Sequence, residues 1–116
     1  MTIEEIRKYC LKLPGVTEDI KWKDHLCFSV GAKMFLLTSP DSFPVSASFK
    51  TKDELFEELT TREGIIPAPY MARNKWVHLD NIDRLTASEW KEHIKTSYDL
   101  VYSKLPAKLK KEILEG

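Results

Sequence analysis

The spacing of apolar residues changes twice along this chain, and no other feature of the sequence restricts the fold as strongly. In residues 2–13 apolar side chains recur at helical intervals. From residue 22 to residue 49 they alternate with polar side chains, which is typical of half-buried strands. The helical interval then returns in residues 51–64 and 86–105. A chain of 116 residues that combines both periods is predicted to form a single α+β domain over residues 1–116.

Three segments carry the signature of a capped helix start, a Thr followed three residues later by a Glu. They are Thr2 to Glu5, Thr51 to Glu54 and Thr86 to Glu89. We expect the first helix to end before Pro14-Gly15 and the second near Gly64. The third should run to about residue 105, and a short fourth helix should begin at Pro106, since proline suits a first helical position.

Four strands are expected between these helices, over residues 22–30, 33–37, 45–49 and 75–79. Gly31-Ala32 is predicted to form a hairpin turn, and residues 66–70 a loop. Strands joined by short connections favour an antiparallel sheet with helices packed on one face, a two-layer sandwich. The alternation places these residues on the covered face: Leu26, Phe28, Val30, Val45, Ala47, Phe49, Val77 and Leu79. The open face would then carry His25, Cys27, Ser29, Ser46, Ser48, Lys50, Trp76 and His78.

The charge is balanced overall but is segregated along the chain. Eighteen basic residues against eighteen acidic ones exclude the strong global field of a histone-like nucleic-acid binder, so any anion site must be local. Residues 51–64 carry a net charge of −3, whereas residues 65–79 hold two bases and no acid.

Arg73 and Lys75 alternate with Tyr70 and Trp76, a combination that can hold phosphate and stack on bases. The same pattern also fits two loop-anchoring aromatics beside ordinary surface charges. The basic tail 104–111 likewise fits either a second electrostatic contact or a stabilised helix C-terminus.

Enzyme and metal motifs are absent from the sequence. It contains no P-loop, nucleophile elbow, dinucleotide fingerprint or HExxH pattern, so we expect a non-enzymatic protein without a cofactor. His25, Cys27 and His78 offer at most three ligands where a structural zinc site needs four, so no metal is expected. Cys10 lies on the apolar stripe of the first helix, which predicts a buried thiol. Without an apolar run of about 20 residues, the protein is expected to be soluble and cytoplasmic, with no membrane contact.

A series of short segments in a fixed order resembles the YjbR/MmcQ family of small bacterial proteins over nearly the whole chain. The segments are Tyr9-Cys10, Leu13-Pro14-Gly15-Val16, Gly31-Ala32-Lys33-Met34-Phe35, Phe49-Lys50-Thr51 with Glu54-Leu55, Pro69-Tyr70-Met71, Lys75-Trp76, Leu79-Asp80, Ser97-Tyr98-Asp99-Leu100-Val101 and Lys104-Leu105-Pro106. The resemblance implies a YjbR-like α/β domain whose β-hairpins project as two wings. It also implies double-stranded DNA as the partner, because the family has been described as DNA-binding.

The resemblance selects Lys33, Lys50, Lys75 and Trp76 as binding residues, and Arg73 and Asn74 are their neighbours in sequence. We expect the cations to contact phosphates and Trp76 to pack against sugar or base. The chain departs from many relatives at residues 71–73, where they carry a histidine or a further base, and at Asn81, where they carry glycine.

Two other functions also fit the sequence. One is a protein- or peptide-binding module that uses the open sheet face or the edge of strand 45–49. The other is a small-molecule site lined by Trp22, Tyr70, Trp76 and His78, since loops rich in proline and aromatic residues often border pockets.

Overall fold

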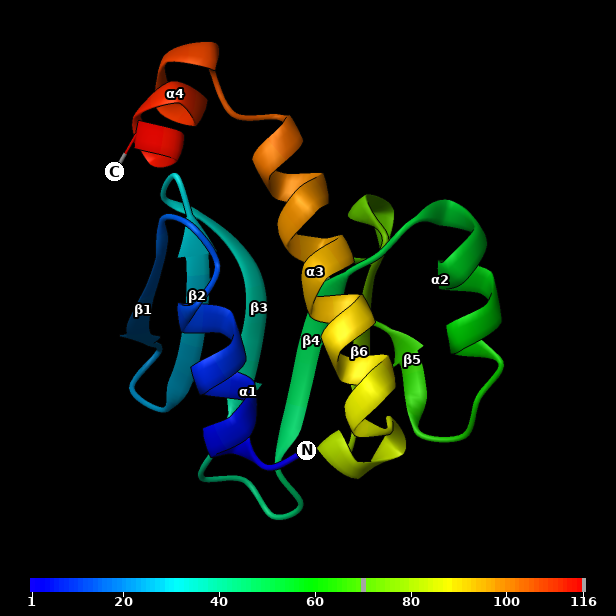
Figure 1. The fold of residues 1–116 in the computed structure, drawn as a ribbon. Coiled ribbons are helices and arrows are strands. Elements are labelled where there is room, and N and C mark those ends of the chain that lie inside the picture. The colour runs from blue at the N-terminus through cyan, green and yellow to red at the C-terminus, as the bar shows by residue number, and fades with distance from the viewer. Residues whose placement is uncertain (70, 116) are drawn as a thin grey trace.

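A six-stranded antiparallel sheet forms one layer of the protein, and helices cover one of its faces. The computed structural model describes residues 1–69 and 71–115 (Figure 1). The strand order is β1-β2-β3-β4-β6-β5, and every neighbouring pair is antiparallel. The strands are β1 (Val16–Lys21), β2 (His25–Val30), β3 (Lys33–Ser39), β4 (Ser46–Lys50), β5 (Ile65–Pro67) and β6 (Trp76–Leu79).

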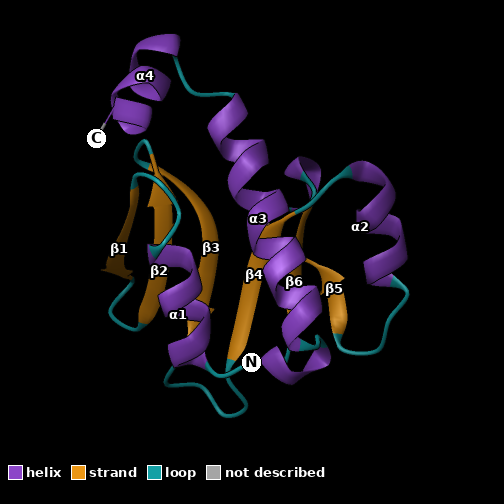
Figure 2. Ribbon diagram, viewed as in Figure 1, coloured by secondary structure: helices purple, strands orange, loops and turns teal. Residues whose placement is uncertain are grey.

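The helices are α1 (Ile3–Leu11), α2 (Asp53–Thr60), α3 (Ala87–Ser103) and α4 (Ala107–Glu115), with two short 3-10 helices, η1 (Ala72–Asn74) and η2 (Ile82–Arg84). Helices α1 and α3 lie across one face of this sheet, whereas α2 lies beside its β5 border and α4 lies beyond the β2–β3 hairpin (Figure 2). The predicted two-layer α+β sandwich is therefore confirmed. Among the described residues, no helix is long and apolar enough to cross a bilayer.

The core lies between the sheet and α1 and α3. Six of the eight residues predicted for the covered face are at most 2% exposed: Phe28, Val30, Ala47, Phe49, Val77 and Leu79. The other two, Leu26 and Val45, are partly buried and pack against the same cluster. The predicted inward face is thus confirmed, since a slip of one residue in any strand would have turned its apolar residues outward. The prediction of an open opposite face is wrong for four of its eight residues, which are at most 9% exposed: Cys27, Ser29, Ser48 and Trp76.

Both capping boxes that flank the core, at Thr2 and Thr86, form as predicted. The one predicted at Thr51 is wrong, because the N-cap of α2 is Lys52 and no side chain caps this helix. The Thr51 N–H instead donates to the Lys75 carbonyl at 2.9 Å, which extends the pairing of β4 with β6. The backbone of Thr51 therefore continues the hydrogen bonding of the sheet just past the end of β4 instead of capping α2.

Two strands were not predicted, and one predicted strand starts later. β1 was missed because its six residues include three charged ones and show only a partial burial pattern. β5 has three residues and falls at the start of the expected loop 66–70. The strand predicted from residue 22 starts at His25, because Trp22 and Lys23 have φ values of 51° and 74°, which are left-handed and end β1 in a turn.

The edge of strand 45–49, which a protein or peptide partner was expected to use, is not free. β4 is an inner strand that pairs with β3 on one side and with β6 on the other.

The hairpin β2–β3 turns at Gly31 and Ala32, whose φ values of 56° and 64° fit a type I′ turn, as predicted. A Cβ at Gly31 would lie within 2.8 Å of the Leu105 side chain, so only glycine lets Leu105 pack this closely. The start of α4 thereby lies beside the hairpin turn, at the end of the sheet shown at the top of Figure 1.

Candidate nucleic-acid interface

Three lysines from distant parts of the chain line one groove at the hairpin end of the sheet. Lys33 starts β3, Lys50 ends β4 and Lys104 follows the last residue of α3. Asn74 and Trp76 form part of the wall, and the groove has a volume of about 310 Å³. Within the described residues, no acidic side chain lines it. We call this site the lysine groove.

The groove exists because β3 and β4 separate at this end of the sheet. Their last paired residues are Leu36 and Phe49. Beyond that pair, the Ser97 hydroxyl of α3 bridges the two strands: it accepts from the Lys50 N–H at 3.1 Å and donates to the Phe35 carbonyl at 2.6 Å. Ser97 is fully buried, so it holds the strands apart from inside the protein. The strand ends diverge from this point, and Lys33 and Lys50 flank the opening.

Lys50 is the most restrained cation of the lysine groove. Its Nζ donates to the Asn74 carbonyl at 2.6 Å, which ties β4 to η1. Partial burial lowers the pKa of Lys50, the nearby charge of Lys104 lowers it further, and Asp53 opposes both. A bound anion would offset this repulsion between lysines, so the groove favours a negatively charged ligand.

The structure separates the remaining predicted cations from the groove. Arg73 is exposed on η1, beside Asn74, and forms no ion pair with any residue that the structure describes. Lys75 has a left-handed φ of 61°, and its Nζ lies 4.9 Å from the centre of the Phe56 ring on α2. Lys75 therefore makes a cation–π contact beside the acidic helix and does not line the groove.

Trp76 lines the groove but does not have the predicted role. Its side chain is 6% exposed, because it packs at the end of β6 opposite Lys50. A ring with so little free surface cannot stack on a base, so Trp76 acts as a wall rather than as a platform.

The residues expected to line a small-molecule site are not gathered in one place. His78 lies on the open sheet face, in a cavity of about 180 Å³ that His25 and Ser48 also line. The Ser48 hydroxyl lies 2.8 Å from His78 Nδ1, and burial lowers the pKa of His78. Trp22 is 66% exposed in the turn after β1, and its ring meets the His25 ring in a T-shaped arrangement at 5.9 Å between centroids. Tyr70 lies outside the described residues.

Two of the side chains considered as metal ligands make other contacts: Cys27 Sγ donates to the His25 carbonyl at 3.8 Å, and His78 Nδ1 pairs with the Ser48 hydroxyl. Within residues 1–69 and 71–115, no three His, Cys, Asp or Glu side chains are placed to hold a metal ion. Cys10 is fully buried, and burial raises the pKa of its thiol to about 12. Cys27 is 1% exposed, and its pKa is also raised by burial.

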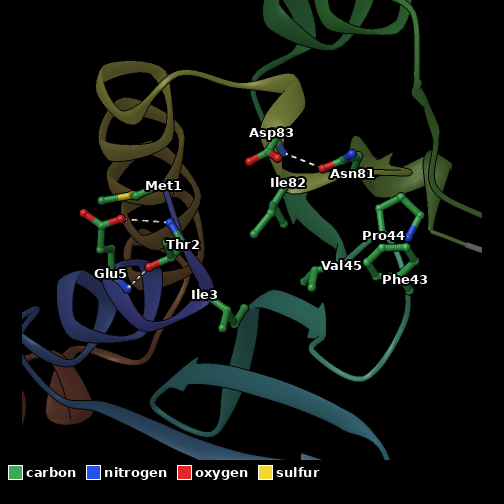
Figure 3. A pocket seen from close by; sticks show the side chains of 10 residues that line it. All are labelled: Met1, Thr2, Ile3, Glu5, Phe43, Pro44, Val45, Asn81, Ile82 and Asp83. Atoms are coloured by element: carbon green, nitrogen blue, oxygen red, sulfur yellow. Dashed lines mark hydrogen bonds between the residues drawn. The ribbon is translucent and has the colours of Figure 1, made fainter.

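A wider hollow at the opposite end of the sheet does not have the character of an anion site. Residues of the N-terminus, the β3–β4 loop and η2 line it, with a volume of about 530 Å³ (Figure 3). Its charged side chains are Glu5 and Asp83, and among the described residues no Lys, Arg or His lines it, although the N-terminal ammonium group of Met1 belongs to the same lining. Phe43, on its rim, is fully exposed.

Sequence reasoning did not place Lys104 with the other lysines. It was considered only as part of the basic tail, because no spacing or motif links the end of α3 directly to Lys33 and Lys50. The signal that was available is the Gly31-Ala32 turn, since a glycine there admits the Leu105 side chain that follows Lys104.

Comparison with known proteins gives a consistent family and fold. The family model YjbR matches residues 11–100. The crystal structure of Deinococcus radiodurans protein DR2400, described as a DUF419 domain, superimposes with a TM-score of 0.85 at 28% identity, over 97% of this chain and 87% of that one. A Pseudomonas syringae protein superimposes with a TM-score of 0.70 at 21% identity, over 87% of this chain and 99% of that one. No curated protein matches the chain.

Proposed function

This chain belongs to the YjbR family, and from that premise and the lysine groove we propose that it is a cytoplasmic, non-enzymatic DNA-binding protein. The observation that carries the proposal is the convergence of Lys33, Lys50 and Lys104 on one groove without an acidic residue in its lining. The zero net charge of the chain leaves no general attraction to nucleic acid, so binding depends on such a local site.

The groove suits the sugar-phosphate backbone better than base edges. Lys33 and Lys104 are exposed and free to reach phosphate oxygens, whereas Lys50 is held in place by Asn74. Arg73 is exposed on η1 next to Asn74 but outside the groove lining, and we count it as a fourth phosphate contact. Contacts of this kind position a protein on a duplex without reading its sequence.

The proposal predicts a steep salt dependence. Four phosphate contacts give a slope of about −3.6 for the logarithm of the binding constant against the logarithm of salt, at about −0.9 per contact. Fluorescence anisotropy of a labelled duplex, titrated from low to moderate salt, measures this slope. No anisotropy change at low salt would refute the proposal.

Alanine substitutions then locate the site. Lys33→Ala and Lys104→Ala should each weaken binding roughly tenfold at 50 mM salt and reduce the slope by about one, for every duplex sequence. Lys91→Ala is a matched control, because Lys91 is equally exposed on α3 but lies 13 residues from Lys104, about 20 Å along the helix. Equal losses for Lys91 and Lys104 would show that the groove is not the site.

A small anion is the second candidate ligand for the same groove. The volume of about 310 Å³ beside Trp76 is near the lower limit for small-molecule pockets. Competition decides between the two: a nucleoside monophosphate that displaces the duplex at micromolar concentration favours the small ligand. A monophosphate that displaces the duplex no better than simple salt at the same ionic strength favours DNA as the ligand.

A further inference from the structure

The outer border of β1 is free for a further strand. β1 is the outermost strand of the sheet, and among the described residues it pairs only with β2 (Figure 1). The Ile20 N–H donates to the carboxylate of Asp19 at 2.9 Å, in an exposed position, so it points away from β2. Residues 16, 18 and 20 share this outward direction, because the hydrogen-bonding side alternates along an antiparallel strand. A side chain of β1 itself therefore occupies a backbone donor that another strand could use.

The same end of β1 exposes large apolar side chains. Ile20 is 56% exposed, and Trp22, in the turn that follows β1, is 66% exposed. The helical layer reaches β1 at Glu18, which pairs with Arg7 of α1, and it leaves Ile20 uncovered. Exposed apolar side chains beside outward backbone donors favour the addition of a strand.

Two residues of opposite charge flank Ile20 on the face of the sheet that points away from the helices. Burial raises the pKa of the Cys27 thiol, Lys21 lowers it and Asp19 raises it, so both charges lie near that thiol. Neither Asp19 nor Lys21 forms an ion pair with a residue that the structure describes. An acid and a base on either side of an exposed isoleucine are therefore available to a partner.

Pairing of β1 with a second copy of itself is restricted to a few registers. Residues opposite each other must both point toward the partner strand or both point away, so a two-fold pairing is centred on one residue. Centring on Glu18, Asp19 or Lys21 places a like charge opposite itself. Centring on Thr17 leaves all three charges without an opposite one. Among residues 17–21, only Ile20 as the centre pairs Asp19 of each copy with Lys21 of the other, which is the stabilising arrangement for directly opposed charges.

We propose that β1 pairs with β1 of a second copy of this chain around Ile20, which joins the two six-stranded sheets into one antiparallel sheet of a two-fold dimer. The Asp19 carboxylate then leaves the Ile20 N–H for Lys21 of the partner subunit. The freed Ile20 N–H donates to the carbonyl of Ile20 of the partner subunit. Both copies use the same surface, so the assembly closes at two subunits.

Sedimentation equilibrium of the wild-type protein at rising concentration tests the association. The mass should increase from the 13.5 kDa of the monomer toward twice that value and no further. A mass that stays at 13.5 kDa at about 1 mM protein, or that rises past the dimer, would overturn the proposal.

Charge exchange then tests the register. Asp19→Lys and Lys21→Asp each place like charges opposite one another in the homodimer, and each should weaken self-association about tenfold. An equimolar mixture of the two variants restores both opposite-charge pairs and should associate as the wild type does. A mixture that associates no better than either variant alone would overturn the proposal.

A further pair of variants tests the border itself. Ile20→Lys places two like charges at the centre of the junction and should abolish the dimer. Ile66→Lys is the matched control, because Ile66 is 50% exposed on β5 at the other border of the sheet, and it should leave the dimer unchanged. Equal effects of the two variants would overturn the proposal. None of these measurements involves nucleic acid, so their outcome is independent of whether the lysine groove binds DNA.

Discussion

Replacing Ser97 by alanine should destabilise the protein by about 2–3 kcal/mol. The hydroxyl satisfies two backbone groups at once, the Lys50 N–H at 3.1 Å and the Phe35 carbonyl at 2.6 Å. Leaving a buried polar group unpaired costs about 1–3 kcal/mol. We assign the larger share to the Phe35 carbonyl, because that bond is fully buried, whereas the bond to Lys50 is only partly buried.

Urea unfolding followed by circular dichroism measures this loss, which should also lower the melting temperature by about 10 °C. Ser103→Ala is the matched control: it removes an exposed hydroxyl near the end of the same helix and should change stability by less than about 0.5 kcal/mol. Alanine favours the helix at both positions, and more so at the interior position 97, so the difference between the variants is a lower bound for the contribution of the buried bridge. A loss below about 0.5 kcal/mol for Ser97→Ala would mean that the two strands pair directly without the hydroxyl, and the explanation of the groove would then be wrong.

Three further predictions concern pH, thiol chemistry and backbone strain. Burial lowers the pKa of His78 below 6.5, so the unfolded chain binds a proton at this residue more readily than the folded protein does. The contribution of His78 to stability should therefore be complete above pH 6.5 and be lost as the pH falls below it. Urea titrations at several pH values measure this loss, which should be smaller for His78→Gln. A thiol reagent at pH 8 should leave Cys10 and Cys27 of the native protein unmodified but label both in urea, and rapid native labelling would contradict their burial. Gly64→Ala should cost about 2 kcal/mol in thermal unfolding, because φ is +81° and the new methyl group would clash with the Arg84 guanidinium; an unchanged melting temperature would show that this side chain moves away freely.

The fold was predictable where the sequence pattern and the local hydrogen bonding agree. The capping boxes at Thr2 and Thr86 are each followed directly by an apolar helical stripe, and α1 and α3 start at these positions. Thr51 carries the same signature, but the carbonyl of Lys75 lies within reach of its backbone N–H. That competing bond comes from a residue 24 positions later, so no local pattern can reveal it.

The strands at the two edges of the sheet escaped prediction for a different reason. An edge strand buries only part of one face, and the apolar alternation that identifies inner strands is then weak. β1 shows this, since its Glu18 faces α1 and pairs with Arg7 at 2.6 Å instead of entering the core. β5 is too short for any periodicity to appear.

The structure brings some of the residues proposed for the site together and separates others. Lys33, Lys50, Asn74 and Trp76 do line one groove, whereas Lys75 turns toward Phe56 because of its left-handed backbone. The burial of Trp76 depends on strand pairing, and the approach of Lys104 depends on where a 17-residue helix ends. Both are tertiary properties, which residue spacing alone does not encode.

The two outermost strands also limit how far another chain could extend the sheet. β5 has only three residues and ends at Pro67, whose nitrogen has no hydrogen to offer a docking chain. β1 is longer, and although its Glu18 is paired with Arg7, Asp19 and Ile20 are exposed. Fibre-like growth of the sheet would therefore have to proceed from the β1 border rather than from β5.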